Sequence, residues 1–264
     1  MPSSPDSSAL TVTPLPAFND NYLWLLARGR EAAVVDPGDA APVQRALDRH
    51  DLRLAAILVT HHHGDHVGGV LDLKSRTGAR VFGPAGERIE GVDVALRGGD
   101  RVDVLDTGFR VIDVPGHTAG HIAYFAADHS PPLLFCGDTL FACGCGRLFE
   151  GTARQMVASL DALAALPAST RVHCAHEYTL ANIRFALTVE PGNAALRERA
   201  ARDEATRRRG EPTVPSTIGL ELATNPFLRC DVPEVRASIA GSTADAVDRT
   251  AIFAALRERK NGFR

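Results

Sequence analysis

The chain has few of the features that mark a secreted or membrane-embedded protein. Its 264 residues include five cysteines, an odd number without a framework spacing, which favours a reducing compartment over a disulfide scaffold. No segment approaches the roughly 20 apolar residues that a membrane helix needs. The start, MPSSPDSSAL, lacks the basic and apolar regions of a secretory signal. We therefore expect a cytoplasmic protein with a flexible N-terminal tail, residues 1–10, and no membrane partner.

The chain also lacks an excess of charge of either sign. Its 29 basic and 32 acidic residues give a formal net charge of −3. Binding to nucleic acid phosphates requires a basic surface, so we expect no nucleic-acid partner. This net charge is compatible with small neutral or anionic substrates. With 45% apolar residues the chain can bury a core, and its length suggests one large domain or one and a half.

The densest chemistry lies in one ten-residue segment, THHHGDHVGG, residues 60–69. It holds four potential metal ligands: His61, His63, Asp65 and His66. Imidazole and carboxylate groups bind zinc and similar divalent ions. The segment follows an apolar run, 54–59, that is typical of a buried strand, and the strand period of two places His61 and His63 on the same side. Four ligands so close in sequence can hardly surround one ion, so more ligands should come from elsewhere.

Three later segments have the same form, an apolar strand-like run that ends beside a histidine or an aspartate. They contain His117 in 114–121, Asp138 in 134–139 and His176 in 172–178. Four strand ends that carry such side chains predict a preformed pocket.

In this order and spacing the motifs resemble the metallo-β-lactamase superfamily. The superfamily motifs are HxHxDH at 61–66, PGHTAGH at 115–121, GDTLF at 137–141 and HEYT at 176–179. Within the superfamily, further segments closely resemble glyoxalase II, the hydroxyacylglutathione hydrolases: GCGR at 144–147, FEGT at 149–152, NPFLR at 225–229 and RERKNGF at 257–263. The resemblance runs from about residue 17 to residue 263.

The resemblance implies an α/β (α+β) fold, an αββα sandwich with a C-terminal helical domain. We expect a catalytic domain over 11–178 and a helical substrate-binding domain over 179–264. Periodicity predicts strands within 9–37 and at 54–60, 79–82, 92–95, 101–104, 109–114, 121–126, 133–136 and 171–174. It predicts helices at 40–50, 67–77, 153–166, 179–190, 194–209 and 244–260.

The resemblance further implies two divalent metal ions per chain. Asp138 would bridge them, with His61, His63 and His117 on one ion and Asp65, His66 and His176 on the other. Zinc is favoured, and iron and manganese are alternatives. Asp65 and Asp138 are the expected catalytic residues, because they would hold a metal-bridging hydroxide that acts as the nucleophile. No protein nucleophile is needed, and the cysteines are interpreted as small apolar residues.

The implied substrate is a glutathione thioester, bound by a monomeric protein. Its expected binding residues are Arg147, Tyr178, Arg257 and Lys260. The last two share a helix face, although a basic C-terminal turn favoured by the helix dipole is the alternative interpretation. Phe149 replaces a tyrosine of the animal enzymes and cannot donate a hydroxyl hydrogen bond, which leaves the affinity for glutathione open.

The implied reaction is hydrolysis of S-(2-hydroxyacyl)glutathione, above all S-lactoylglutathione, to a 2-hydroxy acid (lactate) and glutathione, as in methylglyoxal detoxification. Three alternatives are a persulfide dioxygenase, a lactonase or β-lactamase of the same fold, and a non-enzymatic metal-binding module. The complete set of ligands and the motifs HEYT and RERKNGF argue against each of them.

Three further polar residues have structural interpretations. His62 lies between two ligands and should point away from them, and His121 should pack against or support a ligand. Asp36, in VVDPG, is interpreted as a turn residue, with support of a ligand histidine as the alternative.

Overall fold

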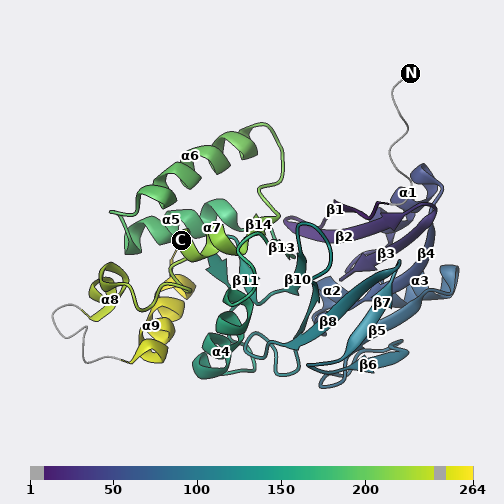
Figure 1. Ribbon diagram of the computed structural model, residues 1–264, viewed down its shortest axis with the longest axis horizontal. Coiled ribbons are helices and arrows are strands. Elements are labelled where there is room, and N and C mark those ends of the chain that lie inside the picture. The colour runs from purple at the N-terminus through teal and green to yellow at the C-terminus, as the bar shows by residue number, and fades with distance from the viewer. Residues whose placement is uncertain (1–8, 241–247, 264) are drawn as a thin grey trace. The chain divides into compact units, whose positions relative to one another are not determined.

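The computed structural model describes residues 9–240 and 248–263 (Figure 1). The chain divides into two compact units. The first comprises Met1–Asp113 and Gly120–Ser130, and the second comprises Val114–Ala119 and Pro131–Arg264. Most of the expected tail, 1–10, lies outside the described residues. The boundary expected near residue 178 separates a catalytic part from a substrate-binding part. The two compact units do not test it, so it stays a prediction.

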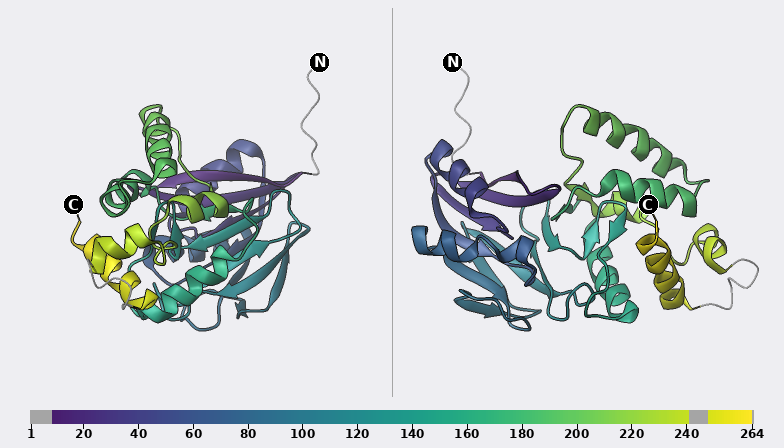
Figure 2. Two further views of the ribbon diagram at one scale, coloured as in Figure 1. Left: turned by 60° about the vertical axis from the view of Figure 1, so that its left-hand side comes forward. Right: turned by 180° about the vertical axis from the view of Figure 1, so that it is seen from behind.

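The first unit is built on a six-stranded sheet. Its strands lie in the order β1 (Thr11–Ala17), β2 (Asn21–Arg28), β3 (Glu31–Val35), β4 (Arg53–Leu58), β5 (Arg80–Pro84) and β6 (Val94–Leu96). The first three strands are antiparallel hairpin neighbours, and β3 to β6 are parallel. Parallel neighbours need crossover connections, and α1 (Ala40–His50) and α3 (Val70–Thr77) supply two of them. Both helices pack their apolar faces into the core of this sheet (Figure 2).

Three further strands of the first unit form a second layer. It contains the antiparallel strands β7 (Arg101–Val104), β8 (Thr107–Asp113) and β9 (Ile122–Ala126). The fully buried Tyr124 hydroxyl donates to the Val59 carbonyl at 2.9 Å, and the Ile122 amide donates to the Thr60 carbonyl at 3.0 Å. These bonds tie β9 to the segment that follows β4, so the ligand-rich loop starts from a rigid position.

The second unit contains three more strands and a short hairpin. β10 (Leu133–Gly137) pairs in parallel with β13 (Arg171–Cys174), which pairs with β14 (Ser216–Thr217). The hairpin joins β11 (Leu140–Phe141) to β12 (Gly144–Cys145). The crossover helix α4 (Ala153–Ala164) begins with a capping box between Thr152 and Gln155, which satisfies amide donors of its first turn.

The remaining helices of the second unit are α5 (Thr179–Val189), α6 (Ala194–Arg208), α7 (Ile218–Thr224), α8 (Pro233–Ala240) and α9 (Arg249–Asn261). Helix α5 packs on α6, and α9 packs on α4 and α8. Arg249 pairs with Asp161 of α4 at 2.8 Å, which adds a polar tie to the α4–α9 contact. Within the part of the chain that the structure describes, none of the helices combines the length and apolar character needed to cross a membrane.

Most expected elements are present, but the helix expected over 67–77 is broken. A short turn, α2 (Gly64–Val67), precedes α3, with Gly68 and Gly69 between them. A Cβ atom at Gly69 would lie 2.5 Å from the Ala40 backbone nitrogen, so close packing against the start of α1 explains the break. The start of the helix expected over 244–260 falls within 241–247, outside the described residues, and α9 begins at Arg249. The short elements β11, β12, β14, α7 and α8 were not predicted.

Candidate metal centre and substrate pocket

The first unit brings His61 and His63 together as the strand period predicted. His61 Nε2 lies 3.2 Å from His63 Nδ1. The ring of His66 lies 4.0 Å from the ring of His61, measured between centroids. His61 and His66 are fully or almost fully buried. These imidazoles are ligands of the kind that divalent cations bind.

Asp65 and His66 are held by contacts from earlier strands and turns. The Asn21 side chain donates to Asp65 Oδ2 at 3.0 Å, and the same oxygen lies 3.6 Å from His66 Nε2. Gly38 packs so closely under this turn that a Cβ there would lie 1.8 Å from the Asp65 carbonyl oxygen. Asn21 was not singled out from the sequence, because an isolated asparagine at a strand start carries no pattern.

Asp36 does more than form a turn, so the favoured interpretation was incomplete. Its backbone has the left-handed φ of 51°, as a turn residue can. Its buried carboxylate also accepts hydrogen bonds from the Thr60 amide and hydroxyl, both at 2.7 Å, and Oδ2 lies 3.2 Å from His66 Nδ1. The alternative is supported as well, because the Asp36 carboxylate lies beside Nδ1 of a predicted ligand.

His62 and His121 have the structural contacts that were expected of them. His62 Nδ1 lies 2.8 Å from the Glu87 carboxylate. The His121 ring stacks on His61 with centroids 4.5 Å apart, and its Nδ1 lies 3.0 Å from the Ile122 carbonyl oxygen. Both side chains therefore hold the ligand loop in place.

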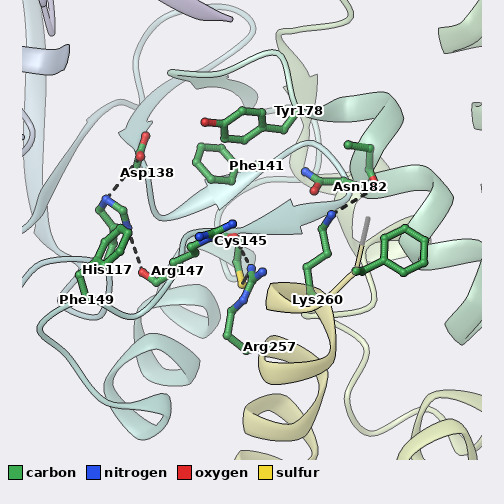
Figure 3. Close-up of a pocket in the computed structure, with 12 residues that line it drawn as sticks. His117, Asp138, Phe141, Cys145, Arg147, Phe149, Tyr178, Asn182, Arg257 and Lys260 are labelled. Atoms are coloured by element: carbon green, nitrogen blue, oxygen red, sulfur yellow. Dashed lines mark hydrogen bonds and ion pairs between the residues drawn. The ribbon is translucent and has the colours of Figure 1, made fainter.

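In the second unit Asp138 lies between two predicted ligand histidines. Its Oδ2 is 3.4 Å from His117 Nε2, and its Oδ1 is 3.3 Å from His176 Nε2. His117 Nδ1 lies 2.9 Å from the Arg147 carbonyl oxygen, which it can reach only as an N–H donor, so Nε2 carries the lone pair (Figure 3). A carboxylate whose two oxygens face different imidazoles is a suitable bridging ligand for two cations.

A cavity of about 480 Å³ opens beside His117 and Asp138 within the second unit (Figure 3). Its lining includes all four predicted substrate residues: Arg147, Tyr178, Arg257 and Lys260. Aromatic side chains and three cationic groups therefore surround one space, an arrangement that suits an anionic ligand with an apolar part.

Arg257 is fixed more firmly than an exposed helix residue would be. Only 6% exposed, it donates through Nη1 to the Cys145 carbonyl at 2.7 Å and through Nε to Asn261 Oδ1 at 3.0 Å. Its guanidinium lies over the Phe227 ring. The interpretation of Arg257 as a solvated basic residue at a helix end is therefore wrong.

Lys260 lies beside Arg257 on α9 and is half-buried. Burial lowers its pKa to about 8, and the positive charges of Arg257, Arg184 and Arg147 act in the same direction. Its ammonium donates to the Ala181 carbonyl at 3.4 Å. The neighbouring positive charges that lower the pKa of Lys260 also attract anions, so this cluster favours the binding of an anionic ligand.

Tyr178 and Phe149 flank the two histidines of this cavity. The Tyr178 ring stacks on His176 with centroids 4.6 Å apart and an interplanar angle of 4°. Phe149, which is 62% exposed, meets the His117 ring edge-on at 5.2 Å. Both rings can contact a ligand while holding a predicted metal ligand in its orientation.

The cysteines are buried and free, as expected of small apolar residues. Burial raises the pKa of Cys143 and Cys174 to about 12 and that of Cys145 to about 11. Thiols that stay protonated at neutral pH are poor nucleophiles.

Comparison with known proteins gives two family matches that follow each other along the chain. Residues 18–176 match the metallo-beta-lactamase superfamily, and residues 177–263 match the hydroxyacylglutathione hydrolase C-terminus.

Individual relatives match over almost the full length. A hydroxyacylglutathione hydrolase of Pseudomonas aeruginosa (strain LESB58) is 58% identical over 259 residues, and one of Albidiferax ferrireducens is 56% identical over 255 residues. Each match covers 96% of this chain and 100% of the relative. Among solved structures, TTHA1623 in a di-iron-bound form is 26% identical, with a TM-score of 0.58 and coverage of 83% of this chain and 100% of that chain.

These matches confirm the fold expected from the motifs, a metallo-β-lactamase fold followed by a helical C-terminal region. The chain belongs to the hydroxyacylglutathione hydrolase family of the metallo-beta-lactamase superfamily.

Proposed function

We propose that this protein is a metal-dependent thioester hydrolase. It converts S-(2-hydroxyacyl)glutathione, with S-lactoylglutathione as the main substrate, and water into a 2-hydroxy acid and glutathione. The observation that carries the proposal is the identity of 56 to 58% with relatives named hydroxyacylglutathione hydrolase, over 96% of the chain. The cationic cavity beside His117 and Asp138 adds chemical support, because glutathione is a peptide with two carboxylates.

We further propose that two divalent ions bind to the seven residues of the superfamily motifs. His61, His63 and His117 hold one ion, Asp65, His66 and His176 hold the other, and Asp138 bridges them. When bound, such ions polarise the thioester carbonyl and lower the pKa of a coordinated water to about 7. Zinc is favoured, and the di-iron form of TTHA1623 makes iron the principal alternative.

The protein's own groups near the reacting bond would orient the metal-binding histidines and exclude solvent. The Arg147 carbonyl keeps the proton of His117 on Nδ1, so that Nε2 carries the lone pair with which it would bind a metal. Phe149 and Tyr178 cover the outer edges of the two histidines. The departing group is a thiolate, which needs no strong acid, since an unperturbed thiol has a pKa of about 8.5.

The cationic residues bind the glutathione part of the substrate. Arg257 is oriented by the Cys145 carbonyl and Asn261, so little side-chain freedom is lost when a carboxylate binds to its remaining N–H groups. Lys260 gains a counter-ion on binding, which relieves its repulsion from the neighbouring arginines. Arg147 extends the same cluster toward His117.

The decisive experiment compares two reactions of metal-replete protein. Loss of the thioester absorbance of S-lactoylglutathione is expected, with formation of one glutathione thiol per molecule consumed. A persulfide dioxygenase would instead consume oxygen with glutathione persulfide, and a lactonase would open lactone rings while leaving the thioester intact. Either of those results would replace the proposed activity.

We also propose a cytoplasmic monomer with a catalytic part over 11–178 and a substrate-binding part over 179–264. Five buried thiols without a disulfide support a reducing compartment. Sedimentation analysis would test the oligomeric state.

A further inference from the structure

A buried ion pair lies beneath the hairpin that lines the cavity. Glu221 in α7 is 0% exposed, and its Oε1 lies 2.8 Å from Arg199 Nη1 of α6. Ser216 also donates to this oxygen. Burial alone disfavours the Arg199 guanidinium, but the carboxylates of Glu221 and Asp203 outweigh it and raise the pKa of Arg199. Glu221 therefore offers one side-chain oxygen to Arg199 and Ser216 and leaves the other for a different set of neighbours.

The second oxygen of this carboxylate contacts the hairpin. Glu221 Oε2 accepts from the Cys143 amide at 2.8 Å and from Asn225 Nδ2 at 3.0 Å. The same Asn225 nitrogen lies 2.9 Å from the Gly144 carbonyl oxygen and 3.2 Å from that of Phe141. Cys143 has a φ of 55°, which is left-handed and unfavourable for a residue with a side chain. Glu221 and Asn225 together stabilise this strained turn.

The hairpin in turn carries two groups of the substrate cavity. Phe141 lines the cavity and meets the Tyr178 ring edge-on at 5.3 Å. The carbonyl of Cys145 accepts the 2.7 Å hydrogen bond that orients Arg257 (Figure 3). A displacement of the turn would therefore move both an aromatic wall of the cavity and the partner of its most firmly held cation.

We propose that Glu221 is a positioning residue for substrate binding, which acts through the turn of the β11–β12 hairpin on Phe141 and Arg257. The inference rests on the proposed function and assigns a role to a residue that touches neither substrate nor metal. It also explains the NPFLR motif in part, because Asn225 fastens α7 to this hairpin.

The carboxylate has four donors around it: Arg199, Ser216, Cys143 and Asn225. Glutamine has the same shape as glutamate but only one acceptor oxygen. The donors on one side of the side chain would therefore face its NH2 group instead of an oxygen. Glu221→Gln should therefore release the turn. We expect KM for S-lactoylglutathione to rise about ten-fold while kcat changes less than about two-fold, the pattern of a loss of binding common to ground and transition states.

Glu190→Gln is the matched control. Glu190 is also a buried carboxylate of the second unit, paired with Arg229 at 2.9 Å. Its carboxylate accepts hydrogen bonds from Arg229 Nε and Nη2, and Arg229 does not belong to the hairpin. Both variants should lower the melting temperature. Only Glu221→Gln should raise KM and weaken the binding of S-methylglutathione measured by titration calorimetry.

Hydrogen exchange of a peptide covering 140–147 provides a readout that does not depend on turnover. Faster exchange in Glu221→Gln, with wild-type exchange in Glu190→Gln, would support the proposal. Equal KM values for the two variants, or wild-type exchange in both, would overturn it. If Glu221→Gln does not fold, Asn225→Ala tests the same link to Phe141 and Gly144. Failure of the wild-type protein to cleave the thioester would reject the proposed function, while the exchange comparison would still test the positioning of the turn.

Discussion

Oδ2 of Asp36 lies 3.2 Å from Nδ1 of His66, and the same carboxylate accepts two hydrogen bonds from Thr60. A carboxylate beside Nδ1 of a histidine fixes the ring and its tautomer and directs Nε2 toward a metal. Asp36 directly follows β3, whereas Thr60 and His66 belong to the ligand loop that follows β4. One side chain therefore connects the orientation of a ligand to the main sheet of the first unit.

Asp36→Asn should lower metal affinity by about 10- to 100-fold, because an amide orients the imidazole less well than a carboxylate. Competition with a chelator of known affinity measures the effect. Asp39→Asn is the control, since Asp39 caps α1 and asparagine is an equally good cap. Unchanged affinity in Asp36→Asn would show that His66 does not need this partner.

Asp65→Ala should remove one ion per chain and most of the activity, since Asp65 is the proposed carboxylate ligand of one ion only. Elemental analysis of the purified variant checks the metal content. Asp72→Ala, which removes an exposed carboxylate paired with Arg76, should retain both ions. Full metal content in Asp65→Ala would reject the proposed ligand assignment.

Arg257→Met should raise KM for S-lactoylglutathione by at least about ten-fold with little change in kcat, because a charge-assisted contact to a substrate carboxylate is lost. Steady-state kinetics measure both constants. The matched variant is Arg259→Met, also on α9, whose guanidinium contacts Ser238 and Thr188 instead of the cavity. If the two substitutions have equal effects, Arg257 has no special role in binding.

The pH dependence of kcat/KM should report Lys260. With a pKa of about 8 the ammonium is charged below this pH and neutral above it, so affinity for an anionic substrate should fall as pH rises through about 8. Lys260→Met should lower kcat/KM at pH 7 and lose this inflection. Lys74→Met, at a lysine that pairs with Asp93 and is not among the residues that line the cavity, should keep it.

The motifs singled out most of the residues that the structure brings together within each unit, because metal ligands recur at fixed spacings on strand ends. His61 and His63, for example, lie side by side as the alternation of an extended backbone predicts, although β4 itself ends at Leu58. Asn21 and Glu221 could not be found this way. Their roles depend on partners 44 residues away at Asp65 and 78 residues away at Cys143, and no local pattern encodes such contacts. Similarly, the break before α3 arises from the approach of another backbone to Gly69, not from the helical periodicity of 67–77.

The burial of Cys145 has a consequence for an enzyme whose product is a thiol. Cys145 lines the cavity in which, on the proposed function, the sulfur of glutathione is released. Mixed disulfides form by attack of a thiolate, and a pKa of about 11 keeps Cys145 almost entirely protonated at neutral pH. A thiol held protonated in this way would resist forming a mixed disulfide with oxidised glutathione at the binding site.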